Sequence, residues 1–355
     1  MSDANTGTGT PQTYGDDALT EAMGRADIDV DGREAPSLSP VHRLLARRDV
    51  AIAIAGIVIF VFFSFASPTF LTEFNLTNMV RNVSLIGIVA VGMTFLLIVG
   101  EIDLSVGSVM GFLVIMLGVL MVRASVDPFL AAGIVILLGI AIGTSAGLIR
   151  ILLNIPSFIV TLAMLTAFRS LALIVSNERP MSAEPVGLFF DLTGGSIFRI
   201  PWLIVWMVIV MIVGGLVLRY SRFGYHAYAT GGNLEAARDS GINTNRVKLI
   251  AFAITGGLVG LAAVLLFGYL HVAEPTSGTG FEFRVIGAVI VGGTALTGGL
   301  GSMTGTFIGT LIIGIITAGM VQLGMSQGAA DISTGFLIVA VGTIDLLLRR
   351  AAVRD

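Results

Sequence analysis

The strongest constraint on this chain is that its apolar residues occur in blocks of about 20, the length that an α-helix needs to cross a bilayer. Charged residues make up 12% of the 355 positions, against ~25% in a typical soluble protein. We therefore predict an all-α integral membrane protein with about ten transmembrane helices, some of them short or broken. The expected spans are Val50–Ser67, Val80–Gly100, Leu104–Val122, Phe129–Ile149, Pro156–Ser176, Trp202–Leu218, Leu249–His271, Val285–Leu296, Met303–Met320 and Ser333–Leu348.

The distribution of arginines predicts the orientation. Arginines cluster before the first span, after the last span and in the loop 219–248. An even number of spans places these three segments on one side, which the positive-inside rule assigns to the cytoplasm. We expect a multi-pass plasma-membrane protein with both termini cytoplasmic.

The first 40 residues differ from the rest in composition. They are rich in Ser, Thr, Gly and Asp and contain no apolar block, so they do not resemble a signal peptide. We predict that residues 1–40 are a disordered cytosolic tail, with a docking segment as the alternative, and that residues 41–355 form the transmembrane domain.

Several function classes are excluded by composition. The chain has no cysteine and three histidines that lie far apart, so we expect neither a metal site nor a catalytic centre nor a cofactor. Its net charge is -3 and Lys248 is its one lysine, so a nucleic-acid partner is not expected. Lys248 follows Val247 rather than a glycine, so the chain lacks a phosphate-binding GxxxxGK[ST] loop. A pump built on this chain must take its energy from another protein or from an ion gradient.

Three charged residues are candidates for a role in transport, because charge inside a membrane is costly and a functional role is the default hypothesis there. Glu101 and Asp103 stand at a tight junction between two spans. They are either proton-coupling groups or part of a helix junction at interfacial water, with Asp103 as the cap and Ser105 assisting. Arg169 lies inside an apolar span. It is either a buried cation satisfied by carbonyls or a carboxylate, or a pathway group that donates to sugar hydroxyls.

Glycines recur at every fourth position in two places. The sets are Gly139, Gly143 and Gly147, and Gly301, Gly305 and Gly309. Each set would form a smooth stripe that lets helix backbones approach closely. We expect packing within the bundle, with a subunit interface as the alternative.

The loop 219–248 contains signals for a short helix. Gly231 and Gly232 should end any preceding helix, Asn233 is a good N-cap, and Gly241 suits a left-handed C-terminal position. The predicted helix is about two turns long and is suited to docking into a groove of another protein. The alternative is a helix that lies on the membrane surface.

The same loop carries a family resemblance. Glu235, Ala236 and Ala237 followed by Gly241 resemble the EAA-x-x-x-G coupling motif of ABC importer permeases, and GGNLEAARDSGIN is similar to the form in ribose-type monosaccharide permeases of the bacterial inner membrane. The stretches 100–108, 156–173 and 291–310 resemble the same family in the same order. Glu101, Ser170 and Tyr225 depart from its usual pattern, which leaves the sugar specificity open.

The resemblance implies a permease that imports a pentose, hexose or related polyol. Its partners would be an ABC ATP-binding subunit, an extracytoplasmic sugar-binding protein, a second permease copy (identical or a paralogue) and membrane lipid. The alternative is a proton-coupled secondary transporter that uses Glu101 or Asp103. The implied coupling residues are Gly232, Asn233, Glu235, Ala236, Ala237 and Gly241, and the candidate pathway residues are Glu101, Asp103, Ser105, Thr161, Arg169, Thr294 and Thr297.

Overall fold

The computed structural model describes residues 48–326, 328–330, 332–336 and 343. The predicted tail 1–40 and most of the predicted last span, Ser333–Leu348, lie outside these residues. The long helices are α3 (Arg48–Ala66), α4 (Glu73–Ile98), α5 (Val106–Gly118), α6 (Pro128–Leu153), α7 (Ser157–Ser176), α9 (Trp202–Tyr220), α12 (Thr244–Leu270) and α14 (Met303–Gln322). The shorter elements are the π-helical turn η1 (Val119–Arg123), α8 (Leu188–Thr193), α10 (Arg222–Gly232), α11 (Leu234–Asp239), α13 (Phe281–Val291), and the two-residue strands β1 (Met181–Ser182), β2 (Ser196–Ile197), β3 (Ile200–Pro201) and β4 (Val272–Ala273).

Seven of the described helical segments are long and apolar enough to cross a membrane. They are α4, α5 continued by η1, α6, α7, α9, α12 and α14, and α3 contributes a shorter apolar helix, Ile52–Ala66. These eight match eight of the ten predicted spans. The expected span Val285–Leu296 is wrong as a crossing helix, because α13 has 11 residues and ends at Val291.

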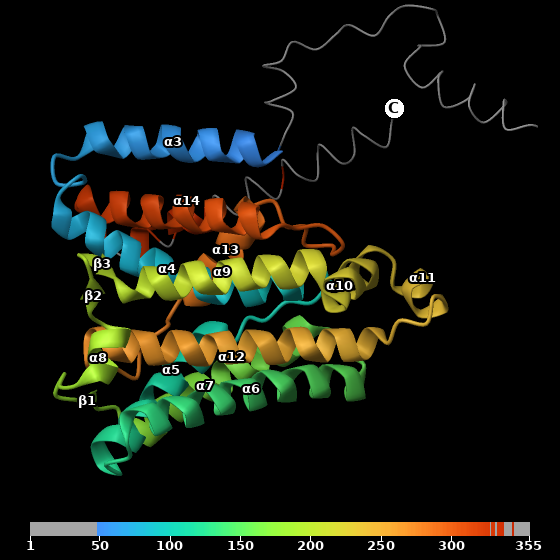
Figure 1. The fold of residues 1–355 in the computed structure, drawn as a ribbon, viewed down its shortest axis with the longest axis horizontal. Coiled ribbons are helices and arrows are strands. Elements are labelled where there is room, and N and C mark those ends of the chain that lie inside the picture. Colours follow the sequence, from blue (N-terminus) through green and yellow to red (C-terminus); the bar gives the residue numbers. More distant parts are fainter. Residues whose placement is uncertain (1–47, 327, 331, 337–342, 344–355) are drawn as a thin grey trace, which may run out of the picture. The chain divides into compact units, whose positions relative to one another are not determined.

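The bundle is built around α4. Every residue of α4 from Val83 to Ile98 is buried. Helix α4 contacts α9, α12, α13 and α14, and α14 in turn contacts α3. Figure 1 shows the long helices running along a common direction. Helices α10 and α11 lie at one end of the bundle, which we call the α11 end. Helix α8 and the paired strands β1 and β4 lie at the opposite end, which we call the β1 end.

The glycine stripe on α6 packs inside the bundle. A Cβ atom added to Gly139 would clash with the carbonyl oxygen of Gly256 on α12, and one added to Gly143 would clash with that of Phe252. The second stripe also packs internally, with Gly305 and Gly309 against α13. Gly301, however, precedes α14, so the prediction that it lies on the same helix face is wrong.

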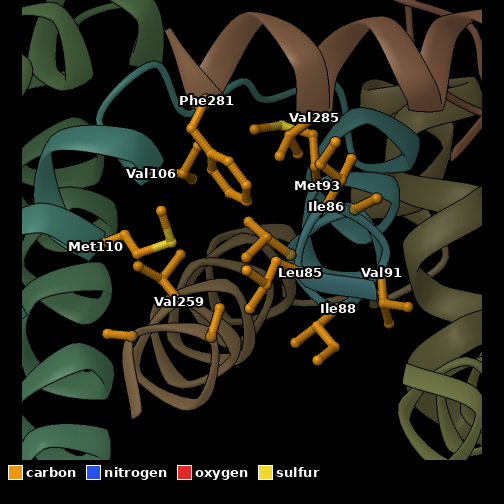
Figure 2. Close-up of a cluster of buried hydrophobic side chains, with 14 of the residues drawn as sticks. Leu85, Ile86, Ile88, Val91, Met93, Val106, Met110, Val259, Phe281 and Val285 are labelled. Atoms are coloured by element: carbon orange, nitrogen blue, oxygen red, sulfur yellow. The ribbon is translucent and has the colours of Figure 1, made fainter. Parts of the chain in front are cut away.

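Two helices begin in the interior. Helix α5 starts at Val106 and α13 at Phe281, and both residues are buried. Figure 2 shows these two side chains in one apolar cluster with Met110 and with Val259 of α12. A Cβ atom on Gly107 would clash with the Glu282 carboxylate, so the first turns of α5 and α13 are in direct contact. Broken helices of this kind are common where a transporter's path passes.

Candidate functional site

Helix α11 forms as the sequence predicts. The Asn233 side chain accepts hydrogen bonds from the backbone N–H groups of Glu235 (3.1 Å) and Ala236 (3.0 Å), which caps the helix. Glu235 and Ala236 are exposed, whereas Ala237 is 4% exposed. The helix therefore rests on its small Ala237 side and presents Glu235 and Ala236 outward.

The turn from α11 to α12 ties the two helices together. The N–H of Ile242 donates to the carbonyl of Ala237 (3.0 Å), and Arg238 Nε donates to Thr244 Oγ1 (3.2 Å) in the first turn of α12. Gly241 has φ +81°, as predicted, a conformation that residues with a Cβ atom rarely adopt. The segment from Ala237 to Thr244 is thus fixed by both backbone and side-chain bonds.

Helix α10 was not expected. It ends at Gly232, where the sequence predicts the end of any preceding helix, and only Asn233 separates it from α11. A Cβ atom at Gly231 would clash with the carbonyl oxygen of Ile98, so this glycine lets α10 pack on the end of α4. Tyr228 donates a hydrogen bond to the carbonyl of Gly301 (2.7 Å), and burial raises the pKa of its hydroxyl, which keeps the proton that the bond needs.

The segment between α4 and α5 brings three of the pathway candidates together. Asp103 Oδ1 accepts bonds from the N–H (2.7 Å) and the hydroxyl (2.6 Å) of Ser105. Thr161 Oγ1 of α7 accepts the N–H of Leu104 (3.1 Å). The expectation that Glu101 and Asp103 reach interfacial water is wrong, because they are 4% and 5% exposed. The Ser105 side chain makes no capping bond to α5, so its hydroxyl serves Asp103 instead.

Glu101 is held by two cations from distant parts of the sequence. Its Oε1 lies 2.6 Å from Nζ of Lys248 in α12 and 2.8 Å from Nε of Arg150 in α6. The Lys248 contact has hydrogen-bond geometry, whereas Arg150 Nε contributes charge without a well-directed bond. Sequence reasoning missed both partners, since their positions near helix ends suggested only cytoplasmic charges.

The remaining candidates lie in two other places. Arg169 Nη1 donates to the carbonyl of Ser277 (2.9 Å), next to the start of α13. Thr294 is buried and follows α13, whereas Thr297 is exposed and its carbonyl lies near Gly100. The structure therefore does not gather all seven candidates into one site.

Glu282 was missed altogether. It is 5% exposed, and its Oε2 has no hydrogen-bond partner among the described residues. Arg169 is one of the cations that act on this carboxylate. The sequence offered a signal, because FEFRVIGAVIV places an acid and an arginine at the start of an otherwise apolar block.

Comparison with known proteins decides the class. Residues 75–342 match the family model described as "Branched-chain amino acid transport system / permease component". The chain belongs to this permease family. The match includes every described membrane helix except α3, together with α10 and α11.

Several relatives of the permease are named for a sugar that they transport. The ribose import permease protein RbsC of Haemophilus influenzae is 35% identical over 82% of this chain and 91% of its own length. RbsC of Bacillus subtilis is 36% identical over 81% of this chain and 89% of its own. The L-arabinose ABC transporter permease protein AraH of Azospirillum brasilense is 37% identical over 76% and 79%.

Proposed function

We propose that this permease is the membrane-spanning subunit of an ABC importer that carries a monosaccharide into the cytoplasm. The observation that carries the proposal is the similarity, over most of both chains, to permeases named for ribose and L-arabinose. Most of the buried polar residues are Ser or Thr rather than charged groups, which suits an uncharged solute because sugar hydroxyls need hydrogen bonds and not counter-ions.

In this proposal α11 is the coupling helix. It is capped and tied to α12, and it exposes Glu235 and Ala236, to which an ATP-binding subunit can dock. ATP binding and hydrolysis by that partner would displace α11 and, through it, the membrane helices. The α11 end is then cytoplasmic, which agrees with the cluster of arginines in the loop 219–248 and the positive-inside rule.

The β1 end would face outward and receive sugar from a binding protein. A second permease copy, identical or a paralogue, would complete the path. Helix α7 would face lipid or this second copy, because only 17% of its most apolar stretch is buried within this chain. Thr161 and Arg169, both on α7, would then stand near the path.

Because the chain contains no cysteine, a single introduced thiol reports one position cleanly. We expect Glu235→Cys to cross-link to the ATP-binding subunit in the assembled importer, and Phe198→Cys, an exposed position at the β1 end, not to. Sugar uptake into vesicles should require ATP and both partner proteins. Accumulation by this chain alone, driven by a proton gradient, would overturn the proposal.

The family description favours a second substrate class, branched-chain amino acids. Competition between a labelled sugar and unlabelled compounds for uptake distinguishes the two substrate classes. We expect unlabelled ribose or arabinose to compete and leucine not to compete, and the reverse result would assign the second class.

A further inference from the structure

The contact between Glu101, Lys248 and Arg150 joins three elements at the α11 end. Glu101 follows α4 in the segment that leads to α5, Lys248 lies in the second turn of α12, and Arg150 lies in the last turn of α6. The side chains of Glu101 and Lys248 are 3% and 7% exposed, and that of Arg150 is 20% exposed. We call these three residues the Glu101 triad.

One side of the triad leads to α11. Lys248 stands four residues after Thr244, whose hydroxyl accepts the bond from Arg238 of α11. Asn243 caps α12 by accepting the N–H of Arg246 (3.0 Å). Since hydrogen-bonded helix turns move together, a displacement of α11 is delivered to the turn that carries Lys248.

The other side leads to the helix starts in the interior. The N–H of Glu101 donates to the carbonyl of Leu96 (2.9 Å), and the N–H of Ile102 donates to Ser157 Oγ (3.1 Å) at the start of α7. The same segment ends at α5, whose first turn contacts Glu282 of α13. A shift of Glu101 therefore reaches α5, α7 and α13.

Burial makes the triad a stiff link. Separating a buried carboxylate from its cations leaves charges that neither water nor another group solvates, which is strongly unfavourable. Glu101 therefore follows Lys248 when α12 moves. Glu101 and Arg150 also line a cleft of about 470 Å³, together with Gly100, Ile102, Asn154 and Ser157.

We propose that Glu101, Lys248 and Arg150 are positioning residues that transmit the movement of α11 to the segment 100–105 and so to the interior ends of α5 and α13. This inference rests on the proposed coupling role of α11. It assigns Lys248, the chain's one lysine, a role in transport that neither the motifs nor the relatives' names indicate.

The test uses the complete importer in vesicles and measures sugar transported per ATP hydrolysed. Because a single substitution leaves a buried charge unpaired, the main variant is Glu101→Gln with Lys248→Met. We expect transport per ATP to fall about tenfold, within the usual range of coupling between sites. The charge swap Glu101→Lys with Lys248→Glu should regain part of the loss, since it restores the ion pair between positions 101 and 248 while Arg150, which is 20% exposed, then stands beside a lysine.

The matched control is Arg246→Met, which removes an exposed cation two residues before Lys248 and should leave transport per ATP unchanged. If the main variant loses thermal stability, Glu101→Asp is the second variant, because it keeps the negative charge but shortens the side chain by one methylene. It should still lower the sugar transported per ATP. Normal coupling in a folded main variant or in Glu101→Asp overturns the inference while the Glu235 cross-link upholds the proposed function. Failure of that cross-link removes the proposed function and this inference with it.

Discussion

The hydroxyl oxygens of Thr94 and Thr306 lie 2.7 Å apart inside the bundle, where α4 packs against α14. Both residues are fully buried. Polar side chains that bond across membrane helices contribute on average about 0.6 kcal/mol and at most ~1.7. We expect Thr94→Val and Thr306→Val to lower stability by less together than the sum of their separate effects, as measured by thermal unfolding in detergent. Strictly additive losses would show that the two hydroxyls do not interact.

Gly139 and Gly133 lie on the same helix, α6, and differ in what surrounds them. A Cβ atom at Gly139 meets the backbone of Gly256 and Gly260, whereas one at Gly133 has no atom within 4 Å. We expect Gly139→Ala to lower the free energy of unfolding by about 1–3 kcal/mol through overpacking. Gly133→Ala is the control and should leave the melting temperature equal or slightly higher. Equal behaviour of the two variants would contradict the close approach of α6 and α12.

Gly241 connects α11 to α12 with a positive φ. A β-branched residue at this position is strained by about 1–2 kcal/mol, whereas asparagine tolerates the left-handed conformation. We expect Gly241→Val to uncouple ATP hydrolysis from sugar uptake in the reconstituted importer, and Gly241→Asn to preserve coupling. Loss of coupling in both variants would mean that the side chain, and not the backbone conformation, is what the partner rejects.

Asp103 distinguishes the ATP-driven mechanism from a proton-coupled one. Both of its hydrogen bonds to Ser105 are accepted by Oδ1, and an amide oxygen can accept the same two bonds. We expect Asp103→Asn to keep most ATP-driven uptake and Asp103→Ala to lose it together with the local structure. A complete loss of uptake in a stable Asp103→Asn protein would instead point to a protonation role.

Arg169 makes one hydrogen bond among the described residues, to the Ser277 carbonyl, and its charge acts on the Glu282 carboxylate. The forked bonding that would forbid lysine is not seen there. We therefore expect Arg169→Lys to keep most stability and Arg169→Leu to lose about 1.5–3 kcal/mol, the value of a hydrogen bond to a charged group. Thermal unfolding checks the order of the two variants.

The sequence predicted features that depend on neighbouring residues. Apolar blocks gave eight helices that the structure confirms, because each helix satisfies its own backbone and needs only length and composition to be recognised. Asn233 and Gly241 located α11 because caps and left-handed turns are local. The glycine pair located the end of α10 at Gly232, but it did not identify α10 itself or the contact of Gly231 with Ile98, which joins distant parts of the chain.

Partnerships between distant residues needed the tertiary structure. Nothing near Glu101 in the sequence indicates Lys248, 147 positions away, or predicts that Asp103 is buried rather than hydrated. The order of residues along the chain fixes which segments are apolar enough to enter a membrane. Only the packing of those segments decides which charges meet, because the low polarity of the interior allows a charge to remain there when folding brings its partner to it.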